Sequence, residues 1–187
     1  MTEELTYVLD SMEKLIANTR DDQMANPTPC VQWTVRDLIN HVTGGSTMFA
    51  LSAELGAVPD DVMGQLMGGD NLGDDFRGAF KVATQRALAA FDEPGVLEKI
   101  VKLPFGEMPA GIALRIAVFD VATHAADIAH ATGQPVADQA VYEQALAIGR
   151  EMIGPDWRRP GVFGEEQSCD DAAPANERIL AFAGRKL

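Results

Sequence analysis

The stretch of residues 110–132 constrains the fold of this chain more than any other segment. It is rich in apolar residues, and it is followed by Gly133-Gln134-Pro135, the order of glycine and proline that typically closes a helix. Its apolar residues recur at helical spacing, which predicts one long helix whose apolar face must be covered by other helices. An all-α fold is therefore expected.

Further segments show the same helical spacing. They are residues 3–19, residues 35–55 with Thr34 as the N-terminal cap, a segment that runs from Phe76 to the Pro94-Gly95 break, residues 138–153, and a short stretch around Leu180. Residues 56–75 predict a loop or a broken helix, and residues 96–109 predict no regular structure. We therefore expect one domain over residues 1–187, a four-helix bundle with long connections and additional C-terminal helices.

The charge of the chain excludes two classes of partner. Fifteen Lys and Arg against 28 Asp and Glu give a formal net charge of -13. This charge repels phosphate backbones and anionic lipids, so neither nucleic acid nor a membrane is expected as a partner. The sequence shows no secretory signal and no apolar run of the roughly 18 to 20 residues that span a bilayer, which predicts a cytoplasmic protein. Cys30 and Cys169 lie far apart and are expected to be reduced thiols.

Ionisable side chains interrupt the apolar face of residues 110–132. At about 100° per residue, Asp120, His124 and Asp127 fall within roughly 60° of one another, and His41 lies on the apolar stripe of residues 35–55. Burial without partners would cost several kcal/mol for each such group, and a divalent cation would supply a partner. Two ligands four residues apart and a third from a neighbouring helix leave one coordination position open, as in catalytic zinc sites.

The same residues also have an explanation without a metal. An inward His41 is commonly a hydrogen-bonded core residue, and Asp120 with His124 can form a polar network. Asp127 is predicted either to orient His124 through its second ring nitrogen, or to cap a helix or pair with an arginine. His130 lies about 120° from His124 around the helix and is expected to be a surface or structural residue.

Two other features are interpreted as structural. Cys30 precedes the helix of residues 35–55 by several positions, so a packed thiol is favoured over a nucleophile. The sequence Trp157-Arg158-Arg159 is the one basic cluster beside an aromatic residue, and it is expected to be a solvated turn.

Three motifs resemble a known family. Residues 28–42, TPCVQWTVRDLINHV, resemble the TPC-x-x-W-T-V-R-D-L-x-x-H signature of actinobacterial DinB-like proteins, a group related to the N-terminal domain of mycothiol-dependent maleylpyruvate isomerase. The spacing Asp120-x-x-x-His124-x-x-Asp127, followed by ATGQP at residues 131–135, resembles a second signature of that group. RILAFAGR at residues 178–185 resembles its C-terminal motif. The resemblance covers nearly the whole chain.

The resemblance implies a DinB-like bundle that holds a divalent metal, most often zinc or nickel. Carried over by position, its ligands fall on His41, Asp120 and His124, with Asp127 behind His124. Many relatives have histidine at position 120 and the isomerase has glutamate, so the shorter aspartate leaves coordination weaker, bridged by water, or absent. The resemblance also implies mycothiol or a similar low-molecular-weight thiol as cosubstrate, a small electrophilic substrate, and possible homodimers. It does not imply isomerase activity, because the isomerase has an additional C-terminal domain that a chain of this length is not expected to contain.

Three functions remain open from the sequence. A metal-dependent S-transferase that uses the thiol is favoured. A catalytically inactive ligand-binding or dimerisation module of the same fold is the main alternative. Metal-dependent hydrolysis, with Asp127 as the base, is the third. Two imidazoles and a carboxylate suit several divalent metals, so the metal itself stays undetermined.

Overall fold

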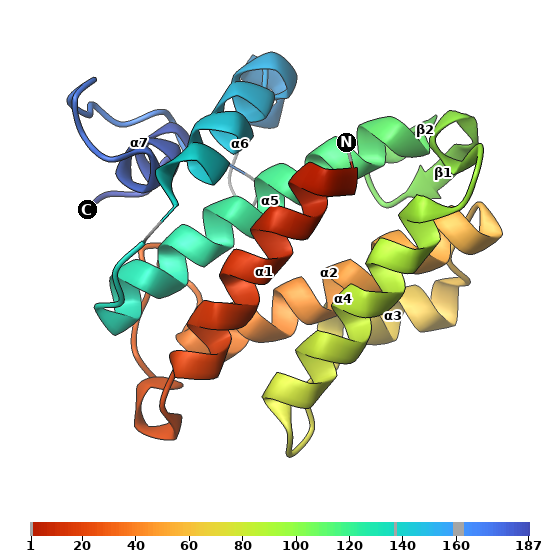
Figure 1. Cartoon of the computed structure of the whole chain (residues 1–187), viewed down its shortest axis with the longest axis horizontal. Coiled ribbons are helices and arrows are strands. Elements are labelled where there is room, and N and C mark those ends of the chain that lie inside the picture. Colours follow the sequence, from red (N-terminus) through yellow and green to blue (C-terminus); the bar gives the residue numbers. More distant parts are fainter. Residues whose placement is uncertain (1, 137, 159–162) are drawn as a thin grey trace.

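The computed structural model describes residues 2–136, 138–158 and 163–187, and its helices dominate the chain (Figure 1). The elements, in chain order, are α1 (Thr2–Asn18), α2 (Val35–Leu55), α3 (Asp60–Gly68), α4 (Phe76–Asp92), β1 (Ile100–Leu103), β2 (Gly106–Pro109), α5 (Ala110–Thr132), α6 (Gln139–Met152) and α7 (Ala175–Phe182). None of the helices in these residues is long and apolar enough to cross a bilayer.

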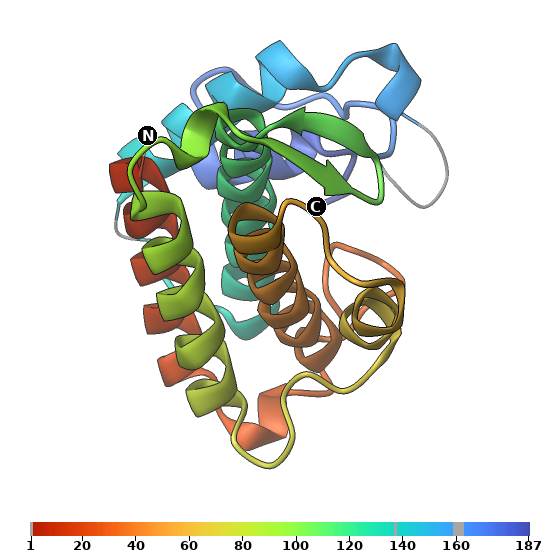
Figure 2. The same ribbon diagram turned by 90° about the vertical axis from the view of Figure 1, so that its right-hand side faces the viewer.

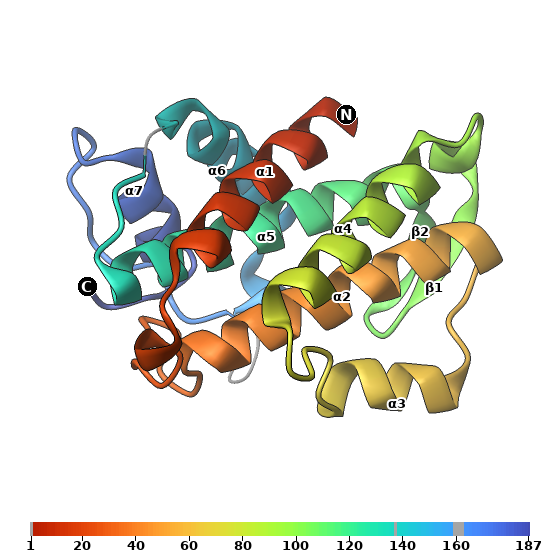
Figure 3. The same cartoon turned by 60° about the horizontal axis from the view of Figure 1, so that its bottom comes forward.

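Four helices form the bundle that the sequence predicted. Helix α1 packs against α4 and α5, and α2 packs against the same two helices, so the four close into a ring around one core (Figure 3). Helices α6 and α7 pack on α5 and on each other, outside the ring. The expected all-α fold, a four-helix bundle with additional C-terminal helices, is confirmed.

Helix α5 is covered on nearly every side. Every residue from 121 to 129 is buried, because α1, α2, α6 and α7 all contact this helix. A helix enclosed in this way must be apolar around most of its circumference, which explains the long apolar run in the sequence. The polar groups of α5 are therefore held in fixed surroundings.

The entrance to α2 is a capped loop that positions Trp33. The Thr34 hydroxyl accepts a hydrogen bond from the Asp37 backbone N–H, and the Asp37 carboxylate accepts one from the Thr34 backbone N–H, which is the predicted N-cap completed as a capping box. Before the cap, the Thr28 hydroxyl donates to the carbonyls of Cys30 and Trp33. These bonds fix residues 28–34 against the start of the helix.

Residues 56–75, predicted as a loop or a broken helix, contain the nine-residue helix α3. It lies close to α2 because Gly44 has no side chain: a Cβ there would come within 2.6 Å of both the Leu66 carbonyl oxygen and the Asn71 side chain. Asn40 holds the connection by donating to the Gly69 carbonyl and accepting from the Asn71 N–H. Of the two adjacent glycines, Gly44 is therefore the one that allows the close packing on α2, since nothing lies within 4 Å of a Cβ at Gly45.

Residues 96–109, for which the sequence predicted no regular structure, form a 3₁₀ turn at Val96–Glu98 and the β1–β2 hairpin. The register pairs Ile100 with Pro109 and Leu103 with Gly106, which leaves Phe105 in the turn. Strands of four residues carry too short an alternation to be recognised from sequence. The hairpin lies at one end of the bundle (Figure 2).

The outer helices meet the bundle at a glycine. A Cβ on Gly149 of α6 would lie 2.3 Å from the Phe119 ring of α5 and 2.9 Å from the Phe182 ring of α7. Both rings are buried, and their centroids are 5.9 Å apart with the planes at 85°. The three helices can approach this closely only with glycine at position 149.

We predict that Gly149→Ala lowers the free energy of unfolding by about 1–3 kcal/mol, because the methyl group overpacks two stiff buried rings. Gly64→Ala is the matched control: it also lies within a helix, but it is exposed and nothing lies within 4 Å of its added Cβ. Urea unfolding followed by circular dichroism measures both. Equal stability of the two variants would contradict the close packing of α5, α6 and α7.

Candidate metal centre and its cavity

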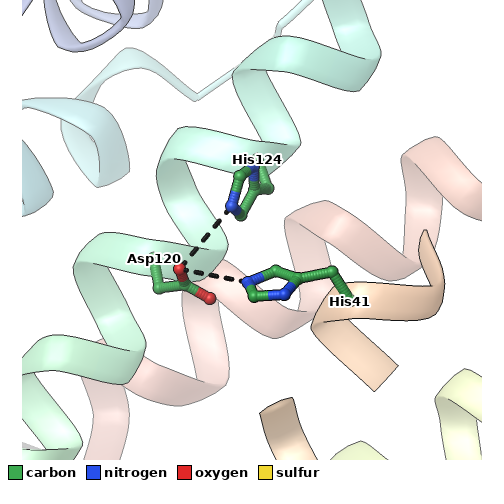
Figure 4. Close-up of side chains that lie close together, drawn as sticks. All are labelled: His41, Asp120 and His124. Carbon is green, nitrogen blue, oxygen red and sulfur yellow. Dashed lines mark ion pairs between the residues drawn. The ribbon is translucent and has the colours of Figure 1, made fainter. Parts of the chain in front are cut away.

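His41, Asp120 and His124 meet inside the bundle (Figure 4). One ligand atom from each residue lies within 4.8 Å of the others. The Nε2 atoms of His41 and His124 each lie 3.6 Å from the same Asp120 oxygen, Oδ1. This geometry brings together two imidazole nitrogens and a carboxylate, which are common ligands of divalent transition metals.

The helices place these three side chains. Asp120 and His124 lie one turn apart on α5, so both project from one face. His41 lies in the second turn of α2, which packs directly against α5. The side chains of His41 and Asp120 are 27% and 29% exposed, whereas that of His124 is only 7% exposed. The centre is therefore open to solvent on the side of His41 and Asp120.

Trp33 packs beside both histidines. Its ring centroid lies 4.6 Å from that of His41 and 5.5 Å from that of His124, and the two imidazoles are 5.0 Å apart. The capped loop before α2 holds the indole in place. The apolar ring limits the access of water to the histidines and restricts their rotation.

Asp127 fixes the orientation of His124. Its Oδ2 atom lies 3.1 Å from His124 Nδ1, so the opposite ring nitrogen, Nε2, is directed toward Asp120. Arg185 donates to both oxygens of Asp127, at 3.4 Å from Nε and 3.2 Å from Nη2, and also to the Ala183 carbonyl. The sequence offered orientation of His124 and pairing with an arginine as alternatives, and Asp127 does both.

The charges of the centre shift its pKa values in opposite directions. Burial alone would raise the pKa of Asp120, but the imidazoles of His41 and His124 outweigh this effect and lower it to about 2. Burial alone would lower the pKa of His41, but the adjacent Asp120 carboxylate outweighs burial and raises it. The carboxylate is therefore ionised at any ordinary pH.

A cavity of about 670 Å³ opens beside the three residues. Its wall comes from the loop before α2, from α2, α3 and α5, from the hairpin turn, from the segment between α6 and α7, and from Arg185 after α7. Most of the side chains are apolar, and they include the aromatic residues Trp33, Phe49, Phe105, Phe119, Trp157 and Phe163. This volume is sufficient for a small organic ligand beside the histidines.

Comparison with known proteins identifies the family of the chain. Residues 5–129 match the family described as "Mycothiol maleylpyruvate isomerase N-terminal domain". The chain belongs to this family. The match includes His41, Asp120, His124 and Asp127, and it ends before Arg185.

Two relatives and two solved structures align with most of the chain. The uncharacterized proteins Rv0738 and MT0763, from two strains of Mycobacterium tuberculosis, are each 36% identical over 184 residues, which is 95% of this chain and 93% of theirs. A crystal structure of a histidine-to-alanine mutant of the mycothiol-dependent maleylpyruvate isomerase has a TM-score of 0.68 at 16% identity, over 83% of this chain and 69% of that one. Another crystal structure of the isomerase has a TM-score of 0.62 at 17% identity, over 78% of this chain and 66% of the isomerase chain. These structures share the fold.

Within this family fold, two sequence expectations about side chains agree with the structure. His130 is exposed, away from the centre. Cys30 is half-buried against the core at the cavity wall, and burial, as the largest effect, raises the pKa of its thiol. A raised pKa lowers the thiolate fraction, as expected for a packed thiol. Cys30 and Cys169 are both free.

The prediction of a solvated turn at residues 157–159 was wrong for the first two of these residues. Trp157 and Arg158 are half-buried and line the cavity, and Arg158 donates to the carbonyls of Gly164 and Phe182. Arg159 lies outside the described residues. A local charge pattern cannot show which turns fold back onto another element, so this error follows from tertiary packing.

Arg185 was not recognised as part of the site from the sequence. The family-like motif at residues 178–185 ends on it, which is the signal that could have drawn attention to it. Its contact with Asp127 spans 58 positions of the chain. Spacing along one helix gives no information about such a contact.

We predict that His41 in the metal-free protein titrates above 6.5, its ordinary pKa, and that Asp120→Asn moves its pKa below 6.5. The variant removes the charge that raises the pKa and leaves the burial that lowers it. Because folding raises this pKa, protonated His41 stabilises the native state below pH 6.5, and this contribution is lost as pH rises through the raised value. Nuclear magnetic resonance titration of the imidazole nitrogens measures the shift. An unchanged His41 pKa in Asp120→Asn would contradict the ion pair.

Proposed function

We propose that this chain is a divalent-metal-dependent S-transferase that joins a low-molecular-weight thiol of the mycothiol type to a small electrophilic molecule. One observation carries the proposal: two imidazoles and a carboxylate converge within 4.8 Å at the wall of a cavity of about 670 Å³. The related isomerase is mycothiol-dependent by name, which supports a thiol as cosubstrate. Such thiols are kept reduced in the cytoplasm, which is the compartment we propose.

The donor set fits a divalent metal. His41, Asp120 and His124 supply borderline nitrogen ligands and one hard oxygen ligand, a set that suits zinc or nickel. The shorter Asp120 still reaches within 3.6 Å of both imidazoles, which supports direct coordination over a disabled site. Asp127 accepts from the second nitrogen of His124, an arrangement that is typical of histidines that bind metals.

The chemistry divides between the bound ion and the chain. A divalent metal in this position would lower the pKa of a coordinated thiol and so present a thiolate at neutral pH. The chain orients His124 through Asp127, shields the histidines with Trp33, and holds the electrophile in the adjoining cavity. In the transfer a carbon–sulfur bond forms, the leaving group departs with its electron pair, and the thiol proton passes to solvent.

The main alternative is a ligand-binding module without catalysis. Asp120 contacts both imidazoles, and in the described part of the chain no buried side-chain nitrogen or oxygen lacks a hydrogen-bond partner. A metal-free polar network is thus physically possible. A thiol-independent hydrolase is less consistent with the geometry, because Asp127 is completely buried and both of its oxygens are already engaged by Arg185.

We predict about one zinc or nickel ion per chain, lost in both His41→Ala and His124→Ala. His130→Ala is the matched control, since His130 lies on the same helix as His124 but is exposed. Plasma mass spectrometry measures the metal, and circular dichroism confirms that the variants keep their helices. A metal-free wild type that stays empty after incubation with zinc and nickel would favour the binding module.

We predict that Asp127→Asn weakens metal affinity by about 10- to 100-fold, because the amide makes His124 a less basic ligand. Competition with a chromophoric chelator measures the affinity.

The single variant leaves the Arg185 guanidinium buried without its anionic partner, which also lowers the stability of the fold. The double variant Asp127→Asn/Arg185→Met removes that unpaired charge. It should recover part of the lost stability and keep the weakened affinity; full recovery of affinity would show that the effect came from folding alone.

Homodimers, expected from the resemblance, stay a prediction. Light scattering on the purified chain measures the mass directly.

A further inference from the structure

We infer that the electrophile taken by this cavity is an uncharged aromatic molecule and that it does not carry a carboxylate. This inference rests on the proposed function, because it names the substrate class of the same site. It is carried by the aromatic wall of the cavity and by the engagement of its two described arginines.

The wall of the cavity is built to contact an apolar ring. Phe49 lies on α2, Phe119 on α5, Phe105 in the hairpin turn, and Phe163 after Arg158, and all four face one space together with the two tryptophans. Phe119 and Phe163 have their ring centroids 5.7 Å apart with the planes tilted by 56°. Aromatic rings in offset or tilted arrangements attract one another beyond the effect of burial. An aromatic ligand would extend this cluster.

The cations that line the cavity are already paired. Arg185 uses Nε and Nη2 on Asp127 and Nη1 on the Ala183 carbonyl. Arg158 uses Nη1 on two backbone carbonyls, and its Nη2 lies 4.0 Å from Glu166.

The other basic and acidic side chains of the described wall are the two histidines of the candidate metal centre, which both contact Asp120, and the acidic residues Asp120 and Glu165. A ligand carboxylate in the aromatic part of the cavity would lose its hydration, and both described arginines would have to be shared with the partners that they already contact. This loss disfavours a carboxylate relative to a neutral ring of the same shape.

The pair Phe105–Trp157 defines the edge of this aromatic region. Phe105 lies in the hairpin turn, and Trp157 ends the short 3₁₀ segment Pro155–Trp157, 52 positions later in the chain. Their ring centroids are nevertheless only 6.0 Å apart, with the ring planes at 69°. Phe105 is 38% exposed, so it contacts both the cavity and solvent. A ring that enters the cavity would cover this exposed face, which makes Phe105 a residue that selects for aromatic ligands.

A matched pair of non-reactive ligands tests the inference: 1,3-dinitrobenzene, which is neutral, and 3,5-dinitrobenzoate, which has the same ring with a carboxylate. Binding to the full chain is measured by isothermal titration calorimetry, without thiol. We expect the neutral ring to bind at least about tenfold more tightly. Phe105→Ala should weaken its binding by roughly three- to tenfold, since one aromatic contact is lost.

Tyr7→Ala is the control variant. Tyr7 is an exposed aromatic residue on α1 that does not line the cavity, and its removal should leave binding unchanged. Equal or tighter binding of the benzoate, no binding of either ligand, or an equal effect of Phe105→Ala and Tyr7→Ala would overturn the inference.

A second arm separates this inference from the proposed function. With the metal-loaded chain and mycothiol, 1-chloro-2,4-dinitrobenzene and 4-chloro-3,5-dinitrobenzoate are compared, each as its rate enhancement over the uncatalysed reaction. In both reactions the thiolate sulfur bonds to the ring carbon, the carbon–chlorine bond breaks, and chloride leaves with the electron pair. We expect the neutral compound to show the larger enhancement. If neither reacts while the binding preference holds, the transferase proposal fails and the ligand class stands; a larger enhancement for the benzoate would overturn the ligand class.

Discussion

A chain of alternating basic and acidic side chains runs through the bundle and supports the rest of the site. It begins at Arg185 near the C-terminus and continues through Asp127, His124 and Asp120 to His41 on α2. Burying any one of these groups alone would be costly, and each is stabilised by its neighbour. The series therefore links the C-terminal segment, α5 and α2.

This series also explains how a stable bundle core can hold reactive, ionisable side chains. Arg185 and Asp127 are nearly or completely buried and hold His124 from behind. Asp120 and His41, at the other end, remain partly open toward the cavity. The groups that must be fixed are thus separated from the groups that must reach an ion or a substrate. The cavity wall adds aromatic surface from segments that lie outside the four-helix ring.

Much of the fold could be predicted because the helices obey local rules. The boundaries of α2 and α5 agree with the sequence, since the cap at Thr34 and the terminator at Gly133 are set by backbone hydrogen bonding within a few residues. The hairpin of residues 100–109 was missed, because its strands are short and owe their stability to packing on α2 and α5. Helix α3 was only half anticipated, because its packing depends on a close approach at Gly44 that no local pattern shows.

The sequence by itself determined the four-helix bundle and the residues that face its interior, because helical periodicity and capping act over one or two turns. It also put Asp120 and His124 on one face of one helix, since their spacing of four positions allows no other result. Only the tertiary structure decided that His41 meets them, that Arg185 reaches Asp127, and that a hairpin and a distant turn complete the cavity. Those contacts join groups far apart in the chain, and they depend on how helices cross and pack, which local spacing does not specify.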